Sequence, residues 1–172
     1  PLIASLIAGD LDVAFLAGPV QEPDIEVIPL GADPFVAVLA NDEYSAELTS
    51  YDPMLLNGIG VIGENGGGAQ LLIENELRAL GVSVQYVFRT NDNGAMQAMA
   101  RNGLAPAIMP LLAVDAHDPN VRVLPLNPPI PPRQILIALP RPALRTAAAT
   151  RFAQIAVEVG QSRLNAGGAI PV

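Results

Sequence analysis

Cysteine, lysine and tryptophan are all absent from the 172 residues. A chain without cysteine forms no disulfide, iron–sulfur cluster or thiolate metal site. The absence of cysteine also gives no indication of whether the protein works in an oxidising or a reducing compartment. Aromatic residues make up 4%, which leaves few rings for stacking against single-stranded nucleic acid. No apolar run reaches the ~20 residues that a helix needs to cross a bilayer. The opening PLIASLIAGD lacks the positive residues of an export signal, so we expect no signal peptide and no membrane partner.

Positive charge is scarce as well. Nine basic residues, all of them arginine, stand against 17 acidic residues and give a net charge of −8. Proteins that bind nucleic acid use clustered basic side chains to neutralise phosphates. We therefore expect that these residues do not bind DNA by themselves.

Apolar residues are abundant at 51%, enough for a core in a chain of a length that buries roughly 70% of its surface. The 17 prolines and 15 glycines lie mainly between the apolar runs, where they separate elements of secondary structure. The first part of the chain predicts a helix over 2–8 closed by Gly9, a strand over 11–16 buried on both faces, and strands over 25–30 and 35–40. Asp33-Pro34 predicts a turn between the last two strands.

The middle of the chain alternates between strand and helix patterns. It predicts a strand over 59–62, a loop over 63–68, a helix over 69–80 closed by Gly81, a strand over 82–88, a helix from Asn91 or Asp92 to Arg101, and a strand over 105–109 ending at Pro110. Strands that alternate with helices through short connections predict a parallel sheet with helices on both faces.

The last part predicts a strand over 121–126, a proline-rich connector over 127–132, a strand over 135–139, a helix over 146–159 ended by Gly160, and frayed chain from Gln161. The strand over 35–40 leaves the first α/β unit, and the strand over 135–139 comes after the second unit is complete. Two passages between two α/β lobes predict a hinged pair with a cleft between them.

The glycine-rich loop 63–68 (GENGGG) lies between a strand and a helix, where phosphate-binding loops are found. Ala69 and Gln70 stand where a P-loop has Lys and Ser or Thr, and the glycine spacing does not match a dinucleotide fingerprint. What remains is a set of amides at a helix N-terminus that can hold a carboxylate or another anion, or else a permissive turn. The segment 90–93 (TNDN) opens the next helix, where it lines the same edge or only caps the helix.

Enzyme chemistry has little support. His117 is the only histidine and has no accompanying carboxylates at ligand spacing, so we expect a solvated loop residue and no metal site. The five serines lie in no G-x-S-x-G motif. Glu74 and Glu76 point to different sides of their helix, and Met96 and Met99 have the spacing of core residues. We expect no catalytic activity and no cofactor.

Four stretches together resemble the effector-binding domain of LysR-type transcriptional regulators. They are GDLDVAF at 9–15, PL at 29–30 with DPFVAV at 33–38, MQAMARNGL at 96–104 running into AIMP at 107–110, and VLPL at 123–126 with the strand over 135–139 and the closing helix. Their order and separation extend the resemblance over nearly the whole chain.

The resemblance implies an α/β fold like that of type 2 periplasmic binding proteins, with two Rossmann-like lobes joined by two crossing strands. Lobe one would hold 1–39 and 133–172, and lobe two 40–132. In this family a small effector in the interlobe cleft changes the arrangement of a dimer or tetramer on DNA. Carried onto this chain, the ligand-binding residues are Ala17, Gly18, Gly63, Glu64, Asn65, Gly66, Gly67, Thr90, Asn91, Asp92 and Pro110. The helix termini among them favour an anionic effector.

The family also has parts that these residues do not include: a winged helix-turn-helix, a linker helix, and a strand, helix and second strand at the start of lobe one. We expect DNA contact only through such a helix-turn-helix, a cytoplasmic location, and a subunit contact along the helix over 69–80. Ala105-Pro106 replaces the usual Gly-Val and removes one backbone donor. The alternative is a periplasmic-type solute-binding receptor, which shares the fold and would carry an export signal or lipid anchor upstream.

Overall fold

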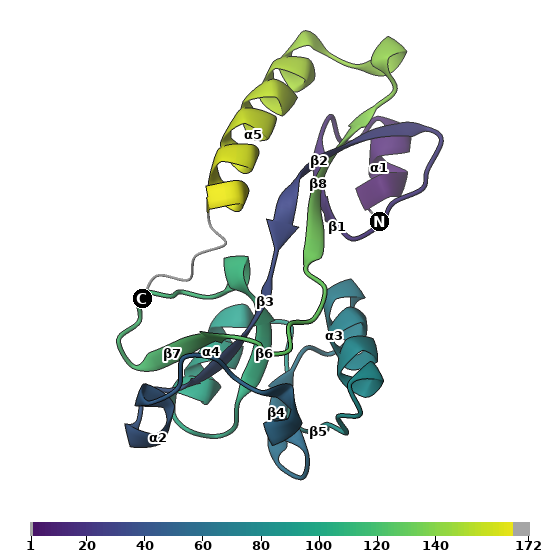
Figure 1. The fold of residues 1–172 in the computed structure, drawn as a ribbon. Helices are drawn as coiled ribbons and strands as arrows, with labels where there is room; N and C mark the ends of the chain where they lie inside the picture. The colour runs from purple at the N-terminus through teal and green to yellow at the C-terminus, as the bar shows by residue number, and fades with distance from the viewer. Residues whose placement is uncertain (1, 167–172) are drawn as a thin grey trace. The chain divides into compact units, whose positions relative to one another are not determined.

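The computed structural model of the chain describes residues 2–166, and the side chains as far as 162 (Figure 1). Its elements are α1 (Leu2–Ala8), β1 (Ala14–Ala17), β2 (Ile25–Asp33), β3 (Phe35–Ala40), α2 (Glu43–Ala46), η1 (Pro53–Leu56), β4 (Gly60–Gly63), α3 (Gly68–Ala79), β5 (Gln85–Arg89), α4 (Asn93–Arg101), β6 (Ala107–Pro110), η2 (Leu111–Ala113), β7 (Val121–Pro125), β8 (Arg133–Pro140), η3 (Pro142–Leu144) and α5 (Ala147–Ala166). None of the helices in this part of the chain is long and apolar enough to span a membrane.

The described chain folds into two compact units, one formed by residues 2–33 and 133–166 and the other by residues 34–132. The chain passes between them twice, after Asp33 and again before Arg133. We expected the residues of β3 in the first lobe. They belong to the second unit instead, because β3 pairs there with both β6 and β7.

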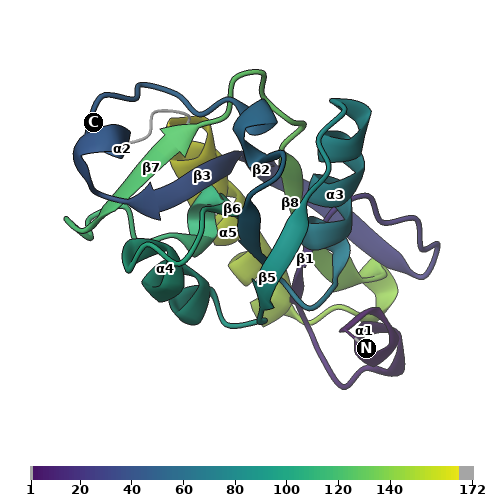
Figure 2. The same ribbon diagram turned by 90° about the horizontal axis from the view of Figure 1, so that it is seen from below.

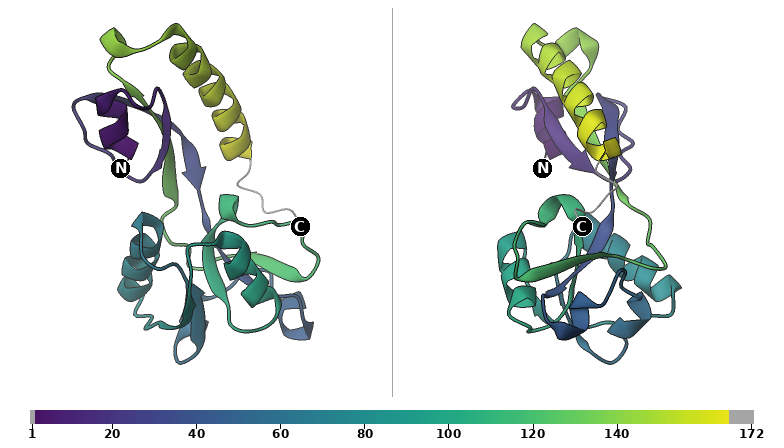
Figure 3. Two further views of the ribbon diagram at one scale, coloured as in Figure 1. Left: turned by 180° about the vertical axis from the view of Figure 1, so that it is seen from behind. Right: turned by 60° about the vertical axis from the view of Figure 1, so that its left-hand side comes forward.

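The first unit is a three-stranded sheet in the order β1-β8-β2, in which β8 runs antiparallel to both neighbours. Side chains alternate between its two faces: Ala138 packs with Leu6 of α1, whereas Ile137 and Leu139 pack with alanines of α5. The two helices therefore cover opposite faces of the sheet (Figure 3). Because a helix covers each face, the residues of β8 from Leu136 to Pro140 are all buried.

For two elements of the first unit, the predicted ends are wrong. The strand expected over 11–16 begins only at Ala14, and Phe15 is 52% exposed, because β1 is an edge strand with one face uncovered at that position. Helix α5 does not end at Gly160 but continues to Ala166. A Cβ atom at Gly160 would lie 3.1 Å from the Cβ atom of Leu30, so this glycine allows close packing of the helix on β2. The predicted fraying over 161–166 is therefore wrong, and 167–172 lie outside the described residues.

The second unit is a five-stranded sheet in the order β5-β4-β6-β3-β7. The predicted parallel arrangement is confirmed for β5, β4 and β6, while β3 and β7 add two strands in antiparallel pairing. Helix α3 packs on one face through Ile73 and Leu77, and α4 packs on the other through Met96 and Ala100. Figure 2 shows the two helices on either side of the parallel strands. The prediction of Met96 as a core residue is confirmed.

Prolines and glycines set the ends of several elements in this unit. Strand β6 begins at Ala107, after Pro106, whose carbonyl oxygen accepts a hydrogen bond from the amide of Ile62 at 2.9 Å. The connector over 127–132 contains no helix or strand, as its prolines predict. Gly81 follows α3 with a φ of 81°, in the left-handed region that commonly ends helices.

Candidate ligand-binding site

The carboxyl ends of the three parallel strands bring most of the predicted site residues to one edge of the second unit. Gly63 ends β4 and lies opposite Arg89 at the end of β5. The amide of Thr90 donates to the carbonyl oxygen of Gly63 at 3.0 Å, and Pro110 ends β6 on the other side of β4. We call residues 63–67, 90–92 and 110 the carboxyl edge. Ligands of open α/β sheets bind outside this end of the strands.

The glycines of the carboxyl edge give α3 an open N-terminus. Gly66 and Gly67 have φ values of 104° and 131°, which side-chain-bearing residues rarely adopt. Gly67 is the N-cap residue of α3, and no side chain caps this helix. The first amides of a helix have no intrahelical acceptor, so those of Gly68 and Ala69 are donors for a ligand. A Cβ atom at Gly68 would meet nothing within 4 Å, whereas one at Gly67 would lie 3.7 Å from Oε2 of Glu64.

The N-terminus of α4 is different, because the protein caps it with its own carboxylate. The Oδ1 atom of Asp92 accepts from the amide of Ala95 at 3.0 Å, and the Oγ1 atom of Thr90 accepts from the amide of Asp92 at 3.2 Å. The interpretation of Asp92 as a helix cap is thus confirmed. An anion would meet repulsion from this carboxylate at α4, whereas no carboxylate caps α3. The Thr90 hydroxyl, which accepts from Asp92, keeps its proton for another partner.

Hydrogen bonds join the two loops of the carboxyl edge. The amide of Asn65 donates to Oδ1 of Asn91 at 2.9 Å, and the amide of Glu64 donates to Oε1 of Gln70 at 2.8 Å. These two amides are therefore already satisfied within the protein. They fix the path of the chain that leads to the open amides of α3.

A second layer of side chains supports the loop from α3 and β5, and the sequence analysis did not identify it. Arg89 donates from NH1 to the carbonyl oxygen of Glu64 at 2.7 Å and from NH2 to Oε1 of Glu74 at 2.8 Å. Its guanidinium lies 3.8 Å from the centroid of the Tyr86 ring. Gln70 donates from Nε2 to the Tyr86 hydroxyl at 2.7 Å and to Glu74 at 2.9 Å. The spacing of Gln70 and Glu74, four residues apart on one helix, was the one signal available in the sequence.

This layer has defined protonation states. The hydrogen bond from Arg89 is the main cause that lowers the pKa of Glu74 below its ordinary value of 4.5. Burial raises the pKa of Tyr86 to about 12, so its phenol stays protonated near neutral pH. The Glu74 carboxylate and the Arg89 guanidinium therefore form a charged pair behind the loop.

Ala17 and Gly18, the other two predicted site residues, belong to the first unit, whereas the carboxyl edge belongs to the second. Ala17 ends β1 opposite Ile135. The amide of Gly18 donates to the carbonyl oxygen of Gln134 at 2.9 Å, and its φ is 89°. These residues thus mark the carboxyl end of β1 within their own unit.

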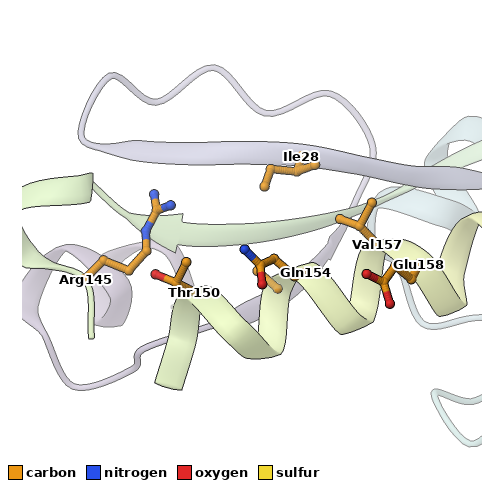
Figure 4. Close-up of a pocket in the computed structure, with 7 residues that line it drawn as sticks. Ile28, Arg145, Thr150, Gln154, Val157 and Glu158 are labelled. Carbon is orange, nitrogen blue, oxygen red and sulfur yellow. The ribbon is translucent and has the colours of Figure 1, made fainter. Parts of the chain in front are cut away.

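The first unit also has an apolar hollow of about 430 Å³ between β2 and α5 (Figure 4). Ile28 and Val157 lie on its sides, and Arg145 lies at one end. The guanidinium of Arg145 already donates to Glu26 at 2.7 Å and to the carbonyl oxygen of Pro140 at 2.8 Å. Thr150, Gln154 and Glu158 of α5 also line the hollow, which contains none of the predicted site residues.

The described part of the chain contains no cluster of side chains that could bind a metal ion. Residues 2–166 contain no group of three or more His, Asp or Glu side chains that could hold a metal ion. His117 is exposed in the loop before β7, where its amide donates to Oδ1 of Asp115 at 3.0 Å. This position agrees with the expectation of a solvated loop histidine.

Comparison with known proteins bears on the whole chain. The family model described as LysR substrate binding domain matches residues 2–161. A protein named as a probable nitrogen assimilation transcriptional activator, from Synechococcus elongatus, is 29% identical over 106 residues. The match covers 60% of this chain and 34% of that protein, so the matched region spans about a third of the relative.

Solved structures of similar fold include complexes with small molecules. The effector-binding domain of QuiR in complex with shikimate has a TM-score of 0.78 and 23% identity, over 94% of this chain and 77% of that one. The CcmR regulatory domain of Synechocystis in complex with 2-PG has a TM-score of 0.77 and 18% identity, over 93% and 78%. HinK of Pseudomonas aeruginosa, a LysR family regulator, has a TM-score of 0.79 and 18% identity, over 95% and 56%.

Proposed function

The chain belongs to the family of LysR substrate-binding domains, and from that premise we propose that it senses a small molecule on behalf of a LysR-type transcriptional regulator. Binding is non-covalent and involves no chemical step. The ligand shifts the protein between arrangements by the difference in its affinity for them. The family match supports this function over a solute-binding receptor of a transporter, which shares the fold.

The ligand we propose is a small anion, such as a carboxylate. The observation that carries this choice is the N-terminus of α3, which no side chain caps and where a Cβ atom at Gly68 would meet nothing within 4 Å. A helix N-terminus attracts negative charge through its unpaired amides and its dipole. Shikimate, which QuiR binds, is itself a carboxylate.

We propose that Ala17 and Gly18 of the first unit contact the same ligand as the carboxyl edge, as the resemblance to the family implies. Pro110 and Gly63 then line the same side as Thr90. In this arrangement both units contact the ligand, and binding is coupled to their relative orientation.

The same proposal includes the location of the protein, its assembly and its contact with DNA. The protein acts in the cytoplasm as a homodimer or homotetramer and contacts DNA through a helix-turn-helix outside these residues. Helix α3 serves as a subunit contact, and Leu71 on it is 60% exposed.

The test measures binding to the 172-residue chain with shikimate, 2-PG and inorganic phosphate as probes, and with glycerol as a neutral control. We expect at least one anion to raise the melting temperature and to titrate calorimetrically. Thr90→Trp and Gly68→Asp should each weaken that binding at least about tenfold, or ~1.4 kcal/mol. The first fills the space beside the amides and the second places a carboxylate there.

Thr49→Trp is the matched control, because Thr49 is exposed in a bend of the same unit and lies outside the carboxyl edge. It should bind as the unmodified chain does. Anion binding that survives both Thr90→Trp and Gly68→Asp, in proteins with native circular dichroism, would refute the site. Failure of every anion to bind would refute the ligand class.

A further inference from the structure

Each of the two passages between the units has a proline next to a charged residue at its junction. The first is Asp33-Pro34 and the second is Pro132-Arg133, so each passage has a proline on the side of the second unit. Proline fixes φ near −65° and restricts the residue before it to extended backbone. Each passage therefore has fewer freely rotating bonds than an ordinary linker.

The residues on the side of the first unit form an ion pair. Asp33 and Arg133 lie opposite each other as the last pair of the β2–β8 ladder. Arg133 donates from Nε to Oδ2 of Asp33 at 2.8 Å, and its NH2 atom lies 2.8 Å from the same oxygen as an ion pair. The Asp33 side chain is 0% exposed and that of Arg133 is 21% exposed. We call Asp33 and Arg133 the hinge pair.

Stability alone does not account for such a pair. The β2–β8 ladder already joins these strands over eight residue pairs, and apolar residues often replace a buried ion pair without loss of stability. What the hinge pair adds is a cross-link between the two passages at the point where both leave the first unit. A cross-link there prevents one passage from turning without the other.

We propose that the hinge pair, Asp33 and Arg133, restricts the orientations that the two units adopt relative to each other. The two passages then move as one stiff hinge about the ends of β2 and β8. This restriction lowers the conformational entropy that a ligand has to overcome when it brings two units together. The proposal does not depend on the identity of the ligand or on the site proposed above.

The experiment measures distances between spin labels in the 172-residue chain without ligand. The chain has no cysteine, so two introduced cysteines are labelled selectively. Arg151→Cys on α5 and Asn75→Cys on α3 place exposed labels in different units. Asn75→Cys with Asn93→Cys gives a control distance within the second unit. Pulsed electron resonance then reports the width of each distance distribution.

The variant that tests the proposal is Asp33→Leu with Arg133→Met, because it removes both charges of the hinge pair. We expect the distribution of distances between labels in different units to become at least about twofold wider. The distribution of distances within the second unit should keep its width. Arg133→Lys keeps one charged contact and should remain close to the original width. Asp33→Asn alone leaves the arginine without a carboxylate and serves as a second variant, with widening expected.

Three results would overturn the proposal. The first is an unchanged inter-unit width in the folded double variant. The second is an Arg133→Lys distribution as wide as that of the double variant, because then the charged contact is not the restraint. The third is equal broadening of the control distance, which would show loosening inside a unit. If the double variant does not fold, the width of Asp33→Asn decides, and no broadening there refutes the hinge role.

Discussion

Glycines 63 and 68, five residues apart, serve opposite purposes, and we predict opposite effects of alanine at the two positions. A Cβ atom at Gly63 would lie 2.5 Å from Cε1 of Tyr86 and 3.0 Å from Oε1 of Gln70, whereas one at Gly68 meets nothing within 4 Å. Gly63→Ala should lower the free energy of unfolding by about 1–3 kcal/mol, as overpacking does. Gly68→Ala, in the first turn of α3, should raise it by about 0.5–1 kcal/mol. Urea unfolding of the two variants measures both values.

The decisive outcome is whether the two substitutions change the free energy of unfolding in opposite directions. Two destabilised variants would show that the space at Gly68 is not open, and two stabilised variants would show that Tyr86 moves aside at no cost. The sequence alone does not distinguish these glycines, because both belong to the glycine-rich segment 63–68, which is predicted as one loop. The difference arises from Tyr86, which approaches Gly63 from the neighbouring strand.

At the scale of elements, the contact between α3 and β5 predicts a dependence of stability on pH. The hydrogen bond from Arg89 holds the folded-state pKa of Glu74 below 4.5, so the folded protein binds this proton less readily than the unfolded chain. The stabilisation is present above pH 4.5 and is lost as the pH falls through the folded-state pKa. Glu74→Gln should therefore be less stable than the unmodified chain at about pH 7, with a smaller gap at about pH 3. Chemical unfolding at the two pH values measures the gap.

Glu76→Gln on the same helix is the control, since Glu76 forms no ion pair among the described residues. Its gap to the unmodified chain should change little with pH. A gap for Glu74→Gln that is constant with pH, or that widens on acidification, would contradict the role of the Arg89 hydrogen bond.

Sequence patterns located most elements and failed where two physical causes produce the same residue. The helix over 2–8 and the strand over 35–40 were predicted to the residue, because Gly9 and Pro34 bound apolar runs that have one interpretation. Gly160 was misread as a helix end. A glycine that ends a helix and a glycine that lets a helix approach a strand look alike in sequence, and only the contact with Leu30 separates them.

At the scale of the whole molecule, the two passages between units followed from the order of strands and helices. The loops 63–68 and 90–93 were singled out as helix N-termini, and Pro110 came from the resemblance to the family. They lie at one edge of the second unit because its parallel strands end there. The supporting layer was missed because its contacts cross between elements. Arg89 reaches Glu64 across 25 positions and Tyr86 reaches Gln70 across 16, and no periodic pattern records such pairs.

The distribution of charge over the whole chain predicts that these 172 residues do not retain duplex DNA. The net charge is −8, and five of the nine arginines form ion pairs with carboxylates. They are Arg89, Arg101, Arg133, Arg141 and Arg145. An arginine already paired with a carboxylate has to give up that partner to neutralise a phosphate. No retardation of a duplex is expected at low salt with about 10 μM protein, a concentration at which basic proteins bind non-specifically.

Retardation that weakens as salt is added would contradict this prediction, because only released counterions give that dependence. The outcome also bears on how a sensor of this composition acts. If the acidic units repel DNA, a ligand bound to them cannot act through direct contact with the duplex. Under the proposed function, the effect then passes through the orientation of the units and the contacts between subunits, for which we have proposed the hinge pair and α3.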